Sequence, residues 1–198
     1  FGGSCFQKDI LNLVYLSRHY NLNEVADYWE QVIKLNDYQK YRFSKNIITN
    51  LFNTVNRKKI SFLGWAFKKD TNDTRESAAI YIADHLIDNM AEIHVYDPKV
   101  SELQIKNDLN YLWSLKGISN SEIDQKLQQV FVYNEPYSCV SDAHAVAVIT
   151  EWDEFKDYRW ENIYKSMQKP AFIFDGRNVL DKSKLEKIGF KFKGIGKV

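Results

Sequence analysis

The chain has 198 residues, with 27 Lys and Arg against 26 Asp and Glu, which gives a formal net charge of +1. This balance offers no strong field for nucleic acid or an acidic membrane surface. No apolar run reaches the roughly 18 to 20 residues of a bilayer span, and no signal-peptide pattern is present, so we expect a cytoplasmic protein without nucleic-acid or membrane partners. Two cysteines and four scattered histidines exclude a disulfide framework and predict no metal site.

The chain begins in a glycine-rich turn without an initiator methionine, as expected of a chain cut from a longer protein. Ser4 and Gln7 have the spacing of a capping box, which predicts a helix starting at Cys5. A thiol in a first helical turn meets unpaired amides and the positive end of the helix dipole, and both favour the thiolate. Lys8 and Asp9 follow at i+3 and i+4 and are expected on the same helix face. A capped surface helix with an incidental cysteine explains the same spacing.

Two apolar stripes with helical spacing occupy the first part of the chain. They comprise Val25, Tyr28, Trp29, Val32 and Ile33, then Ile48, Leu51, Phe52 and Val55. Asn23 and Asp37 are suitable N-caps for helices here. Residues 1–57 are therefore predicted to form a helical N-terminal unit.

From Lys59 onward, short β-branched and aromatic runs alternate with helical patterns. The predicted strands are Ile60–Leu63, Ile93–Tyr96, Phe131–Tyr133, Ala145–Thr150 and Phe172–Phe174. The predicted helices are Ser77–Met90, Trp160–Met167 and Lys182–Ile188, the last stopped by Gly189. Such alternation predicts a Rossmann-like α/β domain with a doubly wound parallel sheet over residues 58–198. The polar, weakly periodic segment Ser101–Gln129 is expected to be an insertion over the sheet edge with some helix.

The loop after the first predicted strand is a candidate nucleotide site, because ligands bind at the carboxyl ends of strands in such folds. It lacks the G-x-G-x-x-G pattern that lets a pyrophosphate lie on the backbone, which argues against an ordinary dinucleotide site. Lys68, Lys69 and Arg75 can instead meet phosphates through their side chains, although a solvated basic loop has the same composition. Asp97 follows the second strand like a ribose-binding acid, but Asp97-Pro98 also reads as a simple turn.

A third candidate follows the last predicted strand, where Gly176 turns the chain and Arg177 can offer its guanidinium to a phosphate or sugar oxygen. Two other reactive residues are interpreted as structural. Cys139 is expected to be a small, partly buried apolar residue, and His144 to lead into a buried strand.

Together these segments resemble the UDP-glucose dehydrogenase family, and most closely its animal-type members, over nearly the whole chain. Three motifs carry the resemblance in the right order, namely GGSCFQKD at residues 2–9, FKKDT with DTRES at residues 67–77, and FDGR at residues 174–177. The sequence departs from the usual animal pattern at Trp65 and Asn72, and most of the segment from Ser101 to Gln129 has no clear counterpart. These departures leave the loop geometry open.

The resemblance also implies roles for individual positions. Cys5 matches the nucleophile, and Asp9 the carboxylate that handles water and protons. Substrate contacts are implied for Phe1, Gly2, Phe67, Lys68 and Arg177, with Lys68 also stabilising oxyanion charge. Contacts with NAD are implied for Cys5, Lys8 and Arg75.

The family reaction is the oxidation of UDP-glucose to UDP-glucuronate with two NAD, through a thiohemiacetal and a thioester on the cysteine. The resemblance further implies a preceding NAD-binding domain, so this chain alone is expected to be inactive. Its helical unit resembles the family's dimerisation core, which implies a homo-oligomer, either a dimer or a hexamer of dimers. Two alternatives stay open: a non-catalytic binding or assembly module, and a dehydrogenase for another sugar nucleotide such as UDP-N-acetylmannosamine or GDP-mannose.

Overall fold

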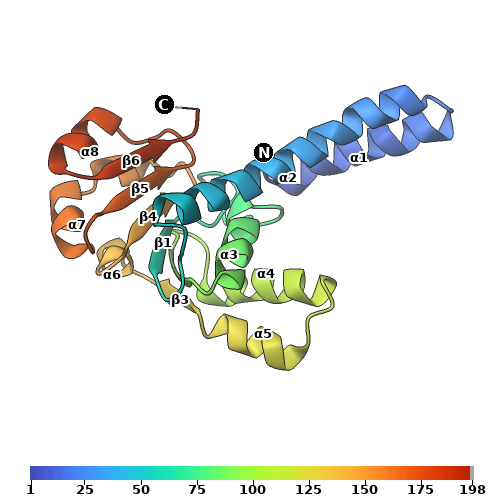
Figure 1. Cartoon of the computed structure of the whole chain (residues 1–198). Helices are drawn as coiled ribbons and strands as arrows, with labels where there is room; N and C mark the ends of the chain where they lie inside the picture. The colour runs from blue at the N-terminus through green and yellow to red at the C-terminus, as the bar shows by residue number, and fades with distance from the viewer. Residues whose placement is uncertain (197–198) are drawn as a thin grey trace.

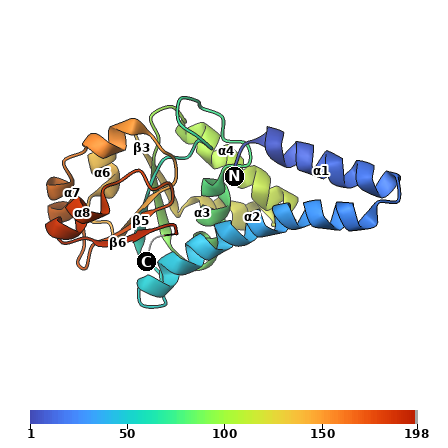
Figure 2. The same cartoon turned by 90° about the horizontal axis from the view of Figure 1, so that it is seen from above.

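The N-terminal part of the molecule is a helical hairpin. A computed structural model describes residues 1–196 and places α1 (Ser4–His19) antiparallel to α2 (Asn23–Asn50). Figures 1 and 2 show this hairpin extending away from the rest of the molecule, with only the second half of α2 lying against it. None of the helices within residues 1–196 is long and apolar enough to cross a membrane.

The predicted N-caps of this region are wrong. Asn23 is the first residue of α2, and the cap position is Leu22, which provides no side-chain capping hydrogen bond. Asp37 lies inside the same uninterrupted helix, where its carboxylate accepts a 3.0 Å hydrogen bond from Lys40. An aspartate followed by an apolar stripe resembles an N-cap in sequence. Here the Asp37 carboxylate bonds to the side chain of Lys40, three residues later in the same helix, instead of to a backbone amide.

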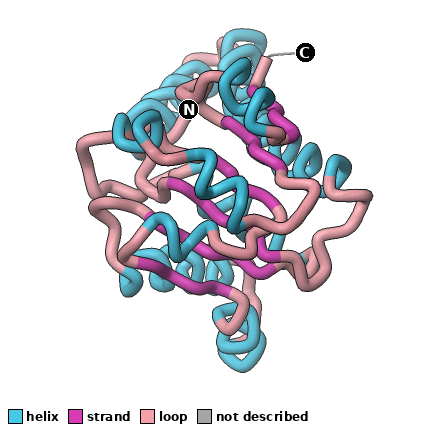
Figure 3. The backbone as a smooth tube through the Cα atoms, turned by 90° about the vertical axis from the view of Figure 1, so that its left-hand side faces the viewer, coloured by secondary structure: helices cyan, strands magenta, loops and turns pink. Residues whose placement is uncertain are grey.

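The remainder is the predicted α/β fold, with a six-stranded sheet in the order β3-β2-β1-β4-β5-β6 and every neighbouring pair parallel. The strands are β1 (Lys59–Leu63), β2 (Glu92–Tyr96), β3 (Val130–Tyr133), β4 (Ala145–Val148), β5 (Phe172–Asp175) and β6 (Lys191–Gly194). The helices are α3 (Ala78–Asp88), α4 (Glu102–Leu115), α5 (Asn120–Leu127), α6 (Pro136–Val140), α7 (Trp160–Ser166), α8 (Lys182–Ile188) and the short 3-10 helix η1 (Asp153–Asp157). Figure 3 shows helices on both faces of the sheet. The fold class is confirmed, and the strand order is that of the Rossmann fold.

The segment predicted to be an insertion over the sheet edge contains helix, as expected, but it is a crossover connection rather than an insertion. Residues 101–129 contain the crossover helix α4 and the helix α5, which together connect β2 to β3. Ile105, Leu109 and Trp113 of α4 are fully buried, at i, i+4 and i+8. Trp113 also donates its indole N–H to Asp84 of α3 at 2.8 Å. One narrow apolar stripe therefore suffices to dock a helix whose other faces are polar.

Two separate apolar clusters hold the chain together. A small cluster within the hairpin contains Ile10, Val14 and Ala26. The large one fills both faces of the sheet and includes Phe43 and Ile47 from the second half of α2. The sheet is thus anchored to the hairpin through α2, and the division of the chain at residue 57 stays a prediction.

Candidate functional site

Cys5 lies in the first turn of α1, as predicted, but the N-cap of this helix is not the predicted residue. The cap position is Gly3, whose φ of 82° is left-handed, and Ser4 is already helical, with no side-chain capping bond. The predicted capping box is therefore wrong, because the helix starts one residue earlier. The thiol of Cys5 is exposed, and Lys8 and Asp9 of the same turn form an exposed ion pair at 3.6 Å.

The glycine turn before Cys5 packs directly on the loop between β1 and α3. The Gly3 amide donates to the carbonyl of Arg75 at 3.1 Å. A Cβ atom on Gly3 would lie 2.9 Å from the ring of Phe67, and one on Gly2 would lie 3.0 Å from the carbonyl of Glu76. Because side chains larger than hydrogen do not fit here, the glycines allow the first motif and the second motif to touch.

Arg75 lies near the nucleophile candidate. Its guanidinium is exposed and makes two hydrogen bonds to the Asp73 carboxylate, at 3.0 and 2.7 Å. Asp73 raises the pKa of Arg75 above its usual value, chiefly through these hydrogen bonds, and Cys5 contributes a smaller electrostatic effect in the same direction. The two residues are thus close enough to interact electrostatically, and an anion beside Cys5 would meet a cation.

Arg177 connects the third motif to the second. Its Nε donates to the carbonyl of Ile149 at 2.7 Å, and its Nη2 donates to the carbonyl of Phe67 at 2.5 Å. The Glu151 carboxylate lies 3.1 Å from Nε and compensates the charge. Arg177 is therefore both a candidate ligand group and a clamp between the loops that follow β4 and β1.

A cavity of about 130 Å³ lies where these loops meet α2. Phe1, Gly2 and Arg177 are among the residues that line it. Its helical wall includes Asn36, Lys40 and Phe43 of α2, which sequence reasoning did not select. Asn36 and Lys40 are only 9% and 7% exposed, so both polar side chains are held inside the protein. Asn36 and Lys40 have helical spacing with the apolar Phe43 and Ile47, and this spacing could have indicated that they lie on the buried face of α2.

Lys68 and Lys69 differ in their surroundings. Lys68 is exposed and is not among the residues that line this cavity; its ammonium lies 5.4 Å from the ring centroid of Phe67. Lys69 forms an ion pair with Asp153 of η1. Of the two lysines, Lys68 is therefore the better candidate for a ligand contact.

Asp97 is a structural residue, which settles the choice between a ribose acid and a turn. It is 7% exposed, and its two carboxylate oxygens accept hydrogen bonds from five donors within the protein. The donors are the amides of Trp65, Ala66, Lys99 and Val100 and the indole of Trp152. Two of these amides belong to the β1 loop, where a dinucleotide phosphate binds in other Rossmann folds. An internal carboxylate already occupies them.

Cys139 and His144 have structural surroundings, in agreement with their interpretation from sequence. Cys139 is fully buried, and burial raises the pKa of its thiol to about 12. His144 accepts the amide of Lys59 at 3.2 Å, and burial lowers the pKa of its ring. Residues 1–196 also hold no group of three or more His, Cys, Asp or Glu side chains arranged to bind a metal ion.

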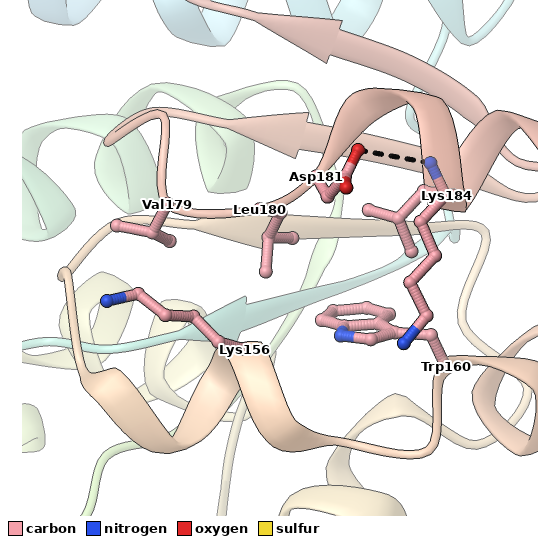
Figure 4. A pocket seen from close by; sticks show the side chains of 7 residues that line it. Lys156, Trp160, Val179, Leu180, Asp181 and Lys184 are labelled. Carbon is pink, nitrogen blue, oxygen red and sulfur yellow. Dashed lines mark hydrogen bonds between the residues drawn. The ribbon is translucent and has the colours of Figure 1, made fainter.

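A second hollow, shown in Figure 4, lies away from these motifs, between η1, α7 and α8. It has a volume of about 250 Å³ and includes Lys156, Trp160, Asp181 and Lys184 in its lining. Two of its polar side chains are used within the protein, since Lys156 pairs with Asp153 at 2.6 Å and Asp181 caps α8. The described residues that line it include none of the candidate site residues.

The strand order and the helices on both faces define a doubly wound α/β protein, a class in which ligands bind at the carboxyl edge of the sheet. The chain belongs to the UDP-glucose/GDP-mannose dehydrogenase family, whose UDP binding domain matches residues 61–182. It is 56% identical to UDP-glucose 6-dehydrogenase of Pongo abelii and 52% identical to UDP-glucose 6-dehydrogenase 4 of Arabidopsis thaliana, over its whole length in both cases. The chain spans 39% and 42% of the lengths of these relatives.

A solved structure of a UDP-glucose dehydrogenase from Pyrobaculum islandicum superposes with a TM-score of 0.71 at 22% identity. It covers all of this chain, which spans 38% of that structure. At this identity the similarity shows the shared fold alone, and it includes the hairpin as well as the sheet.

Proposed function

We propose that this chain provides the catalytic cysteine and the UDP-binding domain of an NAD-dependent UDP-glucose 6-dehydrogenase. One observation carries the proposal: three motifs far apart in the sequence meet through direct contacts. Gly3 bonds to Arg75, and Arg177 bonds to Phe67. The nucleophile candidate, the cationic loop and the third motif thus form one continuous surface. Relatives named UDP-glucose 6-dehydrogenase match the chain along its whole length.

In this proposal Cys5 captures the aldehyde formed by the first oxidation of the sugar C6 alcohol. Its exposed thiol adds to the aldehyde carbon as a thiohemiacetal, whose oxidation gives a thioester that water hydrolyses to the carboxylate. Asp9, one helical residue beyond Lys8, takes the proton of the attacking water. Lys68 stabilises the negative charge that develops on the C6 oxygen. Phe1, Gly2, Phe67 and Arg177 contact the sugar nucleotide.

NAD fits the charges on this surface, because Lys8 and Arg75 are exposed cations close to Cys5. When bound, NAD accepts the two electron pairs that the oxidation releases. The β1 loop does not offer the amides of Trp65 and Ala66 to a dinucleotide, because both donate to Asp97. We therefore expect most of the NAD contacts to come from a preceding domain, the isolated chain to be inactive and the intact enzyme to work in the cytoplasm.

The hairpin supports the proposal of a homo-oligomer. Large apolar side chains remain exposed along both of its helices, among them Tyr15, Tyr28 and Leu35 at 69%, 67% and 59%. A projecting apolar surface of this kind is typical of an interface. Its occupant is proposed to be the hairpin of a second copy, giving a dimer or a hexamer of dimers.

The two alternative functions, an assembly module and a dehydrogenase for another sugar nucleotide, are less favoured than UDP-glucose oxidation. An assembly module without catalysis does not require an exposed cysteine beside Arg75. Dehydrogenases for other sugar nucleotides share the fold, but relatives more than 50% identical are named for UDP-glucose.

The test uses the intact protein that contains this segment. Purified enzyme should reduce two NAD for each UDP-glucose consumed, and Cys5→Ser should stop turnover before UDP-glucuronate forms. The matched control, Cys139→Ser, changes the buried thiol and should retain the stoichiometry. Oxidation of GDP-mannose in preference to UDP-glucose, or full activity of Cys5→Ser, would refute the proposal.

A further inference from the structure

Glu76 has an unusual backbone conformation directly beneath the glycine turn. Its φ is 54°, in the left-handed region that non-glycine residues rarely adopt. Its carbonyl oxygen faces Gly2, and the preceding carbonyl, of Arg75, accepts the amide of Gly3. The conformation of Glu76 therefore sets the surface on which the Cys5 turn rests.

A hydrogen bond from α3 holds the side chain of Glu76. The hydroxyl of Tyr81 donates to its Oε2 at 2.7 Å. Burial, followed by the neighbouring Glu76 carboxylate, raises the pKa of Tyr81 far above its usual value. The phenol is therefore a permanent donor at neutral pH, and the bond to an ionised acceptor is of the stronger kind.

A buried cation on α2 fixes the ring of Tyr81 in turn. The ammonium of Lys40 lies 4.0 Å from the centroid of this ring and 3.0 Å from Asp37. The Lys40 side chain is only 6% exposed, so the cation–π contact is shielded from water. Lys40, Tyr81 and Glu76 thus form a row from the long helix to the turn before Cys5.

We propose that Tyr81 is a positioning residue that holds Glu76 in its left-handed conformation and thereby fixes the Gly2–Gly3 turn that carries Cys5. Tyr81 touches none of the candidate ligand groups and acts through Glu76. Its significance for catalysis rests on the proposed function, whereas its effect on the turn does not.

Hydrogen exchange of the Gly3 amide measures the turn directly in this chain. Tyr81→Phe removes only the hydroxyl, and we expect the amide to exchange about tenfold faster, because a hydrogen bond to a charged group is lost. Tyr96→Phe is the matched control, since Tyr96 donates a comparable bond to Glu154, at 3.0 Å, without touching the turn. Unchanged exchange in Tyr81→Phe, or equal acceleration in Tyr96→Phe, would overturn the proposal.

A glycine substitution at position 76 distinguishes an effect on the backbone conformation of this residue from a general loosening of the turn. Glu76→Ala loses the bond and disfavours a positive φ, whereas Glu76→Gly loses the bond but tolerates that φ. We expect slower Gly3 exchange in Glu76→Gly than in Glu76→Ala, and no further effect of Tyr81→Phe in the glycine background. Equal exchange in the two Glu76 variants would contradict a role through backbone conformation.

The catalytic consequence is tested in the intact enzyme. Tyr81→Phe should lower kcat about tenfold and raise KM for UDP-glucose by a smaller factor, because the turn orients Cys5 and also carries Gly2, a proposed substrate contact. Glu76→Gly should retain more of kcat than Glu76→Ala. An unchanged kcat with faster Gly3 exchange would refute the catalytic role, and an enzyme that does not oxidise UDP-glucose would refute the proposed function while the exchange result still stands.

Discussion

The hairpin and the sheet solve the problem of burying apolar side chains in opposite ways. The sheet encloses its apolar residues between two layers of helices, and Ile60, Phe62 and Ile93 are 0% exposed. The hairpin encloses few, with Ile10, Val14 and Ala26 as its buried cluster, and leaves large side chains such as Tyr28 in solvent. The sheet buries its apolar side chains as a domain that folds by itself does. The hairpin leaves many apolar side chains exposed, as expected of a surface that a partner covers.

The largest contrast should come from the same substitution in each region. Ile60→Ala in the sheet should lower the free energy of unfolding by about 4 to 5 kcal/mol, because its closely packed surroundings leave a cavity. Ile10→Ala in the hairpin should cost about 2 kcal/mol, since fewer buried neighbours surround it. Urea denaturation of both variants provides the measurement. Equal losses would remove the distinction between the regions.

The sheet should also make the protein sensitive to acid through His94. This ring is 6% exposed, its Nδ1 is 2.8 Å from the Tyr133 hydroxyl, and its Nε2 is 3.7 Å from Glu92. Burial, with a smaller effect of Lys59, lowers the pKa of His94 from 6.5 to about 3. The folded state therefore binds fewer protons than the unfolded state, and stability falls as pH drops from the unfolded value toward the folded one.

We expect His94 to cost roughly 2 kcal/mol of stability by about pH 5 relative to neutral pH. Denaturation of His94→Gln across this range should show a flatter pH dependence. His19→Gln makes the same change on an exposed residue of the hairpin and serves as the control. A pH dependence in His94→Gln as steep as that of the parent would contradict the prediction.

The two cysteines should show the same contrast in chemical reactivity, because Cys5 lies in the hairpin and Cys139 lies beside the sheet. Iodoacetamide near neutral pH should label Cys5 at least about 100-fold faster than Cys139, because a buried thiol reacts only after local opening. The high pKa of Cys139 adds to this difference. Peptide mass spectrometry over time gives both rates in one sample. Faster labelling of Cys139 would show that the sheet opens more readily than the hairpin end.

Self-association tests whether the hairpin surface is an interface. Leu35→Glu should weaken dimerisation about tenfold or more, because it places a charge in an apolar contact. Leu103→Glu on α4 is the matched control, since Leu103 is 70% exposed on the sheet side, against 59% for Leu35. Sedimentation equilibrium separates the two outcomes. Equal effects of the two variants, or no effect of Leu35→Glu, would contradict the proposal that the hairpin of a second copy covers this surface.

The predictability of the elements from sequence follows their apolar patterns. The strands β1 and β2 were predicted within a residue, because continuous apolar runs mark strands buried on both faces. The edge strand β6 was missed, since only Phe192 of its four residues is buried. Some helix was expected between Ser101 and Gln129, but the bounds of α4 and its crossover role were not predicted, because Ile105, Leu109 and Trp113 form a stripe only one residue wide.

The site was predictable in its parts but not in its assembly. The motifs identified Cys5, Arg75 and Arg177, whose roles stay predictions. Sequence spacing has no information on distances across the fold, so it could not indicate that Arg177 would reach the Phe67 carbonyl. The polar wall of α2 was missed for the same reason: Asn36 and Lys40 look like solvated helix residues, but Asn36 contacts Phe1 and Lys40 packs on Tyr81 of α3.

We propose above that the loops at the carboxyl edge of the sheet form one site, and its expected ligand is a uridine nucleotide. Isothermal calorimetry of this chain with UDP, GDP and NAD tests it most directly, with Arg177→Ala and, as the control, Arg159→Ala, on an arginine in front of α7. We expect weak binding that prefers UDP over GDP and NAD, and that is lost in Arg177→Ala and retained in Arg159→Ala. Preferential binding of NAD, or UDP binding that Arg177→Ala leaves unchanged, would contradict it.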